Sequence, residues 1–115
     1  MNKEILQRIK EKLRTVPTTP GVYRMLDIDG NIIYVGKAVN LKRRVSSYFL
    51  ATKKQEKVAQ MVEKVYDFEY TLTNSELEAL NLESNLIHKI QPFYNILLKD
   101  GKAFPYIKID IRKDF

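Results

Sequence analysis

The chain has 115 residues, 44% hydrophobic and 30% charged, which is typical of one globular domain with a single core, and no stretch is apolar for long enough to cross a bilayer. The absence of cysteine excludes disulfides, thiolate metal sites and cysteine nucleophiles, and it fits an intracellular, cytoplasmic protein. Lysine and arginine outnumber aspartate and glutamate by 20 to 14, so the net charge of +6 suits a polyanionic partner.

The chain is predicted to begin with a helix and a hairpin. Aliphatic side chains recur at helical spacing over residues 3–14, and Asn2 is a suitable N-cap for this helix. Residues 21–27 and 31–37 have the composition of two strands, and the Asp29-Gly30 pair between them is a strong hairpin signal.

The hairpin carries two tyrosines, each close to a glycine. If its loop has an even number of residues, Tyr23 pairs with Gly36 and Tyr34 pairs with Met25. The two tyrosines then lie on one face as diagonal neighbours, and Gly36 leaves open space beside the Tyr23 phenol. An ordinary cross-strand aromatic pair explains the same pattern, so both interpretations stay open.

The rest of the chain predicts helices and one further strand, and hence an α+β sandwich in which helices pack against a small sheet. The expected elements are a helix from the Asn40 cap to about Phe49, a helix over about 53–65 with a Thr52/Gln55 capping box, an alternating strand over 66–72, a helix that opens with Ser75 and Glu78 and ends before Pro92, and a strand over 105–111. The last strand is either a sheet edge or the start of a further segment. We therefore expect a domain over 1–100, and a terminal strand or linker over 101–115.

A run of basic residues with a single acid, Glu56, follows the hairpin. It is either a solvated basic surface or a side of the domain that faces phosphate groups. The candidate phosphate contacts in this run are Lys37, Lys42, Arg43, Arg44, Lys53 and Lys54.

Glu83 is the most anomalous residue of the helix after Ser75. On a helical wheel it lies in the middle of an apolar arc, between aliphatic residues on both sides. Because burial of an unpaired carboxylate is costly, Glu83 must be paired, protonated or bound to a cation. A metal-ligand role is one explanation, and a buried salt bridge to Arg24 or Arg44 is the other.

The remaining polar groups suit phosphate chemistry. Arg44 flanks the apolar side of its helix, where it can donate two hydrogen bonds to a phosphate, and Tyr48 one turn later binds the same oxygen or fills the core. His88 is the single histidine, which excludes a histidine-rich metal site.

A single carboxylate such as that of Glu83 suits Mg²⁺, which keeps several of its bound waters. With Lys37 and a tyrosine that takes a proton from water, the set fits one-metal hydrolysis of a phosphodiester.

Two short motifs, "GVY" at 21–23 and "YVG" at 34–36, resemble the paired motifs of the GIY-YIG endonuclease superfamily. The segments "IYVGKAVNLKRRVSSYF" at 33–49 and "EALNLESNLIHKIQPFYNILLKDGKAFPYI" at 78–107 extend the resemblance to the UvrC branch of bacterial nucleotide excision repair. It covers the chain from about Ile9 onward. It implies a three-stranded antiparallel sheet flanked by helices, and hydrolysis of one DNA strand on the 3′ side of a lesion.

The resemblance also implies partners and roles for individual residues. The substrate would be damaged double-stranded DNA, the loader UvrB with UvrA upstream, and the cation Mg²⁺ or Mn²⁺. Glu83 would bind the metal, and which tyrosine acts as the base stays open between Tyr23 and Tyr34. The catalytic residues it implies are Tyr23, Tyr34, Lys37, Arg44, Tyr48, Glu83 and Asn95.

Asn95 rests on the resemblance alone, since from the sequence it is simply a turn residue after Pro92. Three residues depart from the family pattern. Val22 and Val35 replace isoleucines, and Phe93 replaces a basic residue, which removes one phosphate contact. Two alternatives remain, namely an enzyme of the same fold with another DNA target and a non-catalytic nucleic-acid-binding module.

Overall fold

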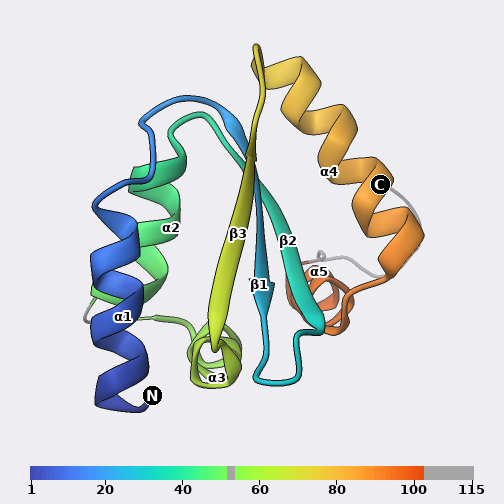
Figure 1. The fold of residues 1–115 in the computed structure, drawn as a ribbon. Helices are drawn as coiled ribbons and strands as arrows, with labels where there is room; N and C mark the ends of the chain where they lie inside the picture. Colours follow the sequence, from blue (N-terminus) through green and yellow to red (C-terminus); the bar gives the residue numbers. More distant parts are fainter. Residues whose placement is uncertain (52–53, 103–115) are drawn as a thin grey trace.

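The computed structural model describes residues 1–51 and 54–102 (Figure 1). The strand expected over 105–111 therefore lies outside the described residues, as do Thr52 and Lys53. In chain order the elements are α1 (Lys3–Leu13), β1 (Gly21–Leu26), β2 (Ile32–Ala38), α2 (Leu41–Leu50), α3 (Glu56–Lys64), β3 (Asp67–Leu72), α4 (Glu76–Ile90) and α5 (Phe93–Lys102).

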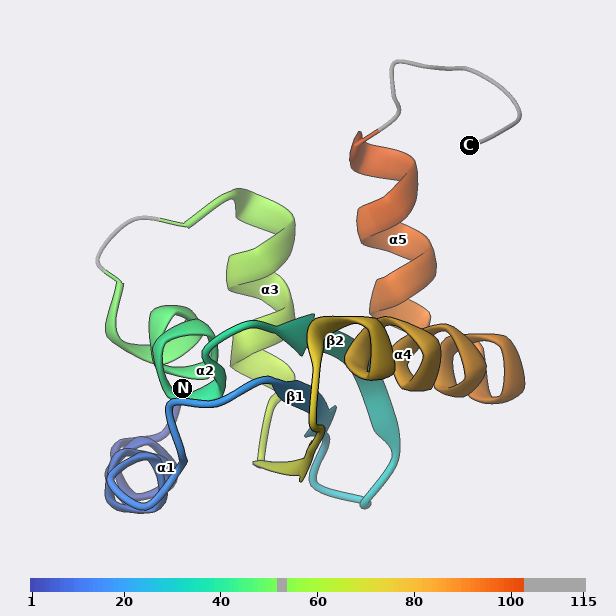
Figure 2. The same ribbon diagram turned by 90° about the horizontal axis from the view of Figure 1, so that it is seen from above.

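The three strands form one antiparallel sheet in the order β2-β1-β3. Its larger core cluster joins one face of the sheet to α1, α2 and α3, and α4 packs on the opposite face around Val22, Val35 and Ala79. Figure 2 shows this division, with α2 and α4 on the two sides of the end of β2. The predicted α+β sandwich with a three-stranded antiparallel sheet is confirmed.

The hairpin loop is closed by Asp27 and Asn31. The amide of Asp27 donates to the Asn31 carbonyl oxygen at 3.0 Å, and the Asp27 carboxylate accepts from the amides of Asp29 (3.0 Å) and Asn31 (2.9 Å). Gly30 takes a φ of 86°, which costs a glycine little. The loop between Asp27 and Asn31 therefore consists of residues 28–30, which is an odd number of residues. The predicted pairing of Tyr23 with Gly36 assumed an even number.

The expected pairing is nevertheless confirmed. A register irregularity between Met25 and Leu26 compensates for the odd loop, so that Tyr23 pairs with Gly36 and Met25 with Tyr34. An extra residue in one strand is a common way to shift the register. The two tyrosines therefore share one face, as the sequence predicts, although the loop differs from the expected one.

Three of the predicted N-caps, at Asn2, Asn40 and Ser75, are confirmed, and one is wrong. Asn2 and Asn40 accept backbone hydrogen bonds at the starts of α1 and α2. α3 begins only at Glu56, and its N-cap Gln55 forms no side-chain capping bond, which excludes the predicted Thr52/Gln55 box. The predicted start at 53 is three residues early, because a box with Gln55 at its fourth position requires a helix that already includes Gln55.

The start of α4 is close to the predicted capping box. Ser75 Oγ accepts from the Glu78 amide at 3.1 Å, as expected. The Glu78 carboxylate accepts from the amide of Asn74 and not of Ser75. Both acceptors still satisfy amides at the helix entry, which is the purpose of the motif.

α5 was not predicted, because Pro92 was interpreted only as the end of α4. Gln91 ends α4 in the left-handed conformation with a φ of 53°, and the buried Pro92 starts the next helix directly. The Pro92 carbonyl accepts from the amides of Asn95 and Ile96. Proline is favoured in a first helical turn because its φ is already helical and its missing N–H has no partner there.

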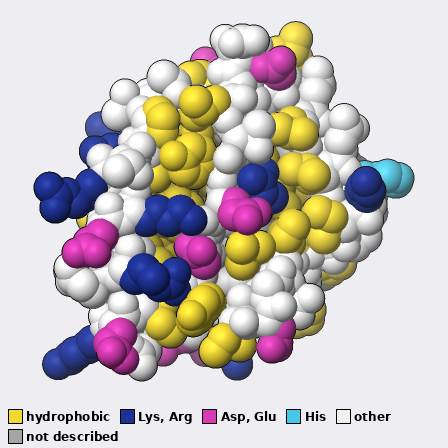
Figure 3. Space-filling view, in the orientation of Figure 1, with side chains coloured by type: hydrophobic (Ala, Val, Ile, Leu, Met, Phe, Trp, Pro, Cys, Tyr) yellow, Lys and Arg dark blue, Asp and Glu magenta, His cyan; other side chains and the backbone are white. Residues whose placement is uncertain are grey.

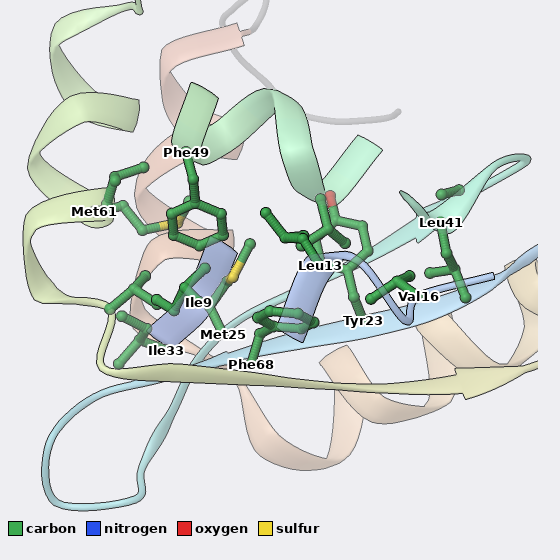
Figure 4. Packing of buried hydrophobic residues seen from close by; sticks show 14 of the residues in the cluster. Ile9, Leu13, Val16, Tyr23, Met25, Ile33, Leu41, Phe49, Met61 and Phe68 are labelled. Carbon is green, nitrogen blue, oxygen red and sulfur yellow. The ribbon is translucent and has the colours of Figure 1, made fainter. Parts of the chain in front are cut away.

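The larger core cluster is centred on β1 and β3. Phe68 is fully buried beside the rings of Phe49 and Tyr70, at centroid distances of 6.3 and 6.4 Å. Figure 4 shows Phe68 and Met25 under the helices, with the ring of Tyr23 rising from the sheet toward α2. The tyrosine therefore belongs to the core and also directs its hydroxyl group toward α2.

Cations on α1 are engaged within the domain. Arg8 donates to the Tyr66 carbonyl oxygen, and Lys12 pairs with Asp67 at 3.1 Å and donates to the Phe68 carbonyl oxygen. Figure 3 shows basic and acidic side chains interspersed on this side of the molecule. These α1 cations therefore stabilise β3, and the basic run at α2 is the better candidate for an external phosphate.

Replacing Phe68 with alanine should lower the free energy of unfolding by about 3–5 kcal/mol, because the truncation leaves a cavity in the core. Leu72→Ala on the same strand is the matched control, since Leu72 is 52% exposed and should cost less than about 1 kcal/mol. Urea denaturation measures both, and equal losses would contradict this description of the core.

Candidate active site

Three tyrosines gather where the hairpin meets α2. Tyr23 and Tyr48 share a hydrogen bond between their hydroxyl groups at 2.7 Å. The ring centroids lie 6.2 Å apart for Tyr23 and Tyr34, 5.7 Å for Tyr23 and Tyr48, and 6.3 Å for Tyr34 and Tyr48. The structure thus brings together three of the predicted site residues, and Tyr48 does not merely fill the core.

Gly36 makes this cluster possible in a way that differs from the prediction. A Cβ atom at Gly36 would lie 2.3 Å from Tyr23 Oη and 2.4 Å from Cζ of the same ring. The glycine therefore leaves no open space beside the phenol, because the Tyr23 ring itself fills that space. The prediction of a gap for a substrate was wrong. The glycine instead lets the ring lie against β2 and reach Tyr48.

The two hairpin phenols differ in exposure. Tyr23 is 1% exposed, and burial raises the pKa of its phenol well above the usual value. Tyr34 is partly exposed, and burial, then Tyr48 and Glu83, raise the pKa of its phenol, whereas Arg44 lowers it. Both phenols are therefore neutral near pH 7 unless further positive charge is present. Glu83 and Arg44 therefore act electrostatically on Tyr34 with opposite sign.

Glu83 is half-buried, less deeply than predicted, as are Leu82 and Ile87 of the same helix. Within the described residues, no charged side chain belongs to the buried class. Leu82 packs against the sheet while Leu80 is 42% exposed, so the buried arc of α4 is rotated away from Glu83. The helical wheel singled out Glu83, but how deeply its side chain is buried depends on which side of α4 packs against the sheet.

The suggested partner Arg24 is engaged elsewhere. Its Nε lies 3.5 Å from a Glu69 carboxylate oxygen, and its guanidinium donates to the Thr71 hydroxyl at 3.0 Å. These contacts lie across β1 and β3, on the far side of β1 from β2. Arg24 therefore stabilises the sheet.

The basic run lies around the first turns of α2, which the Asn40 side chain caps. Its described members are exposed or half-buried, and Lys42 and Lys54 donate to the carbonyl groups of Arg14 and Ala51. Lys37 and Arg44 line a hollow of about 260 Å³. The other residues that line it are Ala38, Val39, Glu76, Leu77, Ala79 and Leu80.

Asn95 contributes from the first turn of α5 rather than from a turn. Its Oδ1 accepts from the Val35 amide at 2.7 Å, and its Nδ2 donates to the Val35 carbonyl oxygen at 2.8 Å. Val35 stands between Tyr34 and Gly36 on the edge strand β2. Asn95 therefore holds the strand that carries the site. Sequence reasoning missed this link because it missed α5.

Glu83 is the candidate ligand for a divalent cation at the phenol cluster, since its charge acts on Tyr34. No group of three or more histidine, cysteine, aspartate or glutamate side chains gathers anywhere in the described part of the chain. The Glu83 carboxylate, whose charge acts on the Tyr34 phenol, is an oxygen donor that suits Mg²⁺ with water in its remaining positions. His88 is exposed, as predicted. Among the described helices, none is long and apolar enough to span a membrane.

A three-stranded sheet with two hairpin tyrosines, a helix arginine and a glutamate on a facing helix defines a GIY-YIG type of domain. The family model of the UvrC-like GIY-YIG domain matches residues 19–96. The chain belongs to the UvrC-like GIY-YIG domain family.

Curated relatives and solved structures agree with this assignment. The chain is 56% identical over 108 residues to UvrABC system protein C of Thermoanaerobacter sp. (strain X514). This match covers 93% of this chain and 18% of that protein. For the Finegoldia magna protein of the same name the identity is 57% over 105 residues, covering 91% and 17%. The chain thus spans less than a fifth of these relatives.

A solved structure has the same fold. It is the GIY-YIG N-terminal endonuclease domain of UvrC from Thermotoga maritima, bound to magnesium as its catalytic divalent cation. The identity is 37% and the TM-score 0.69, over 83% of this chain and 99% of that one. The match covers almost all of that domain.

Gly36→Ala should lower the free energy of unfolding by about 1–3 kcal/mol, because the added methyl group displaces the Tyr23 ring. In a Tyr23→Ala background the same substitution should cost much less. Gly30→Ala is the control, since a Cβ there meets nothing within 4 Å and its cost should be the same in both backgrounds. Denaturant unfolding of the four combinations measures the coupling, and additive losses at Gly36 would contradict the contact.

Asn95→Ala should lower the free energy of unfolding by about 1–3 kcal/mol and speed hydrogen exchange of the Val35 amide, because both backbone groups of Val35 lose their partner. The exposed Asn85 on α4 gives the matched control, Asn85→Ala, which should leave both quantities nearly unchanged. Hydrogen exchange followed by NMR resolves the Val35 amide directly. If that amide stayed as protected as in the parent chain, the role assigned to Asn95 would be wrong.

Proposed function

We propose that the chain is a Mg²⁺-dependent DNA endonuclease domain that hydrolyses one phosphodiester on the 3′ side of a lesion in nucleotide excision repair. The observation that carries the proposal is the cluster of the three phenols of Tyr23, Tyr34 and Tyr48. The charges of Glu83 and Arg44 act on the Tyr34 phenol of this cluster. The 3′ position rests on the resemblance to UvrC-type domains.

Glu83 is the residue that would hold the cation. When bound, the ion supplies positive charge to the scissile phosphate and favours the phenolate form of a neighbouring tyrosine. In the Thermotoga maritima domain, structures with a single tyrosine-to-phenylalanine substitution are still bound to the catalytic divalent cation. This supports a carboxylate, rather than any one phenol, as the group that keeps the ion in place.

Exposure favours Tyr34 over Tyr23 as the residue that takes the proton from water. Tyr23 is 1% exposed and its hydroxyl is already bonded to Tyr48, so an attacking water has little access to it. Tyr34 is partly exposed, and the guanidinium of Arg44 already acts to lower its pKa. Tyr34 is therefore the better general base, and Tyr23 with Tyr48 positions it.

Arg44 and Lys37 are the groups that would bind the phosphate. A guanidinium can donate two parallel hydrogen bonds to a phosphate and holds its charge at any working pH. The ammonium group of Lys37 adds a second positive charge on the same hollow. Together they place the scissile phosphate next to Tyr34 and stabilise the additional negative charge of the transition state.

Selection of the lesion is expected to depend on partners. Relatives named UvrABC system protein C are much longer than this chain, which spans 18% of their length. We propose that UvrB, with UvrA upstream, places this domain on damaged duplex DNA. The cations at α2 then contribute binding to the DNA backbone that is independent of sequence.

Glu83→Gln should lower Mg²⁺-dependent nicking of lesion-containing DNA by at least about 10²-fold while DNA affinity stays within about threefold, because the carboxylate serves the chemistry and not the phosphate backbone. Glu11→Gln on α1 removes the same charge at an exposed position and should leave nicking unchanged.

Arg44→Ala separates the nuclease from a module that only binds DNA. It should weaken DNA binding and reduce the slope of affinity against salt by about one counterion. If Glu83→Gln nicked DNA like the parent chain while Arg44→Ala lost binding, the chain would be a non-catalytic nucleic-acid-binding module. The measurements are nicking of a labelled duplex in the presence of the loader and equilibrium titration at several salt concentrations.

A further inference from the structure

The hollow beside the phenol cluster is apolar to a degree that the phosphate chemistry does not require. Val39 is 60% exposed, Leu77 is 66% exposed and Leu80 is 42% exposed, and all three line it. Leu77 and Leu80 are one helical turn apart on α4, so they present one aliphatic surface. Large aliphatic side chains that gather around a hollow are typical of a binding site.

The hollow is continuous with the proposed phosphate site. Lys37 and Arg44 belong to its lining, and Arg44 acts electrostatically on Tyr34. In Figure 1, β2 ends at the same end of the sheet at which α2 and α4 begin. The three elements whose residues line the hollow therefore meet there. A phosphodiester held by Arg44 would therefore have one of its two flanking nucleosides within reach of the rest of the hollow.

Charge separates the two ends of the hollow. The cations Lys37 and Arg44 come from β2 and α2, whereas α4 contributes the carboxylate of Glu76 and the two leucines. A phosphate is favoured at the cationic side and disfavoured beside Glu76. An uncharged group with apolar faces and amino or hydroxyl donors suits the α4 side, and a nucleoside has all of these features.

The volume suits one such group. The hollow measures about 260 Å³, below the range of roughly 300–1,000 Å³ that is typical of pockets for drug-sized ligands. It thus has room for one nucleotide, with its phosphate on the cationic side, and not for a folded peptide segment. We propose that this hollow binds the nucleoside next to the scissile phosphate, with its base out of the helical stack. The inference rests on the proposed nuclease function and adds a nucleoside subsite to it.

The test uses neutral substitutions that remove the aliphatic wall without changing charge. Leu77→Gln and Leu80→Gln alter exposed residues and should leave the fold intact, which circular dichroism checks. Leu72→Gln changes an exposed leucine of β3 that does not line the hollow, and is the matched control. The probe is a short single-stranded DNA of mixed sequence in the presence of Mg²⁺, titrated at constant salt.

Each hollow variant should bind this probe about tenfold more weakly than the parent chain, because the base loses its contact with one aliphatic side chain. Leu72→Gln should bind like the parent. Binding by the hollow variants that equals that of Leu72→Gln would overturn the subsite while leaving the nuclease proposal standing. If the parent chain neither binds DNA nor, with its loader, cuts it, the proposed function fails and the subsite fails with it.

Methyl NMR locates the ligand independently of affinity. Addition of deoxycytidine monophosphate should shift the methyl signals of Val39, Leu77 and Leu80, whereas inorganic phosphate should leave them in place. Equal shifts with both probes would show that only the phosphate is bound, and would overturn the proposal. Hollow variants that bind DNA normally but lose association with UvrB would assign the surface to a protein partner, which also overturns it.

Discussion

The candidate site depends on one close contact, the ring of Tyr23 against the backbone of Gly36. Because the glycine has no side chain, the ring can lie across β2 and reach the Tyr48 hydroxyl on α2 at 2.7 Å. Together with the packing of Leu41 and Val45 in the core, this contact holds α2 against the hairpin that carries Tyr34. The phenols are consequently part of the hydrophobic core on one side and part of the site on the other, which limits how far any of them can move.

The basic residues of the domain divide into two groups with different tasks. Arg8 and Lys12 on α1 and Arg24 on β1 pair with acids of β3, where they stabilise the sheet. Lys37 and Arg44 lie instead on the hollow at the end of β2. Net charge alone does not distinguish these groups, because every lysine and arginine adds the same charge to the total of +6 wherever it lies. The positions of the acids in the folded sheet decide which cations face a partner.

Local patterns predicted most elements and the pairing of the hairpin, because turn residues and alternation act over a few positions. The odd number of residues in the hairpin loop and the register irregularity between Met25 and Leu26 cancel each other. No local sequence pattern indicates either of them. The wheel singled out Glu83 but overestimated its burial, since only the sheet determines which side of α4 faces inward. α5 and the bond from Asn95 to Val35 were missed because Pro92 also begins a helix. The hollow joins β2, α2 and α4, which are distant in sequence, and so was not predictable.

The phenol cluster also makes the domain a natural optical reporter of its own site. The chain contains seven tyrosines and no tryptophan, so its near-ultraviolet emission comes from phenols alone. Three of these phenols lie within 6.3 Å of one another, close enough for excitation energy to pass between their rings. Occupation of the site by a cation or an oligonucleotide should therefore alter the intrinsic emission without any attached dye, and this gives direct spectroscopic access to the events that the domain performs.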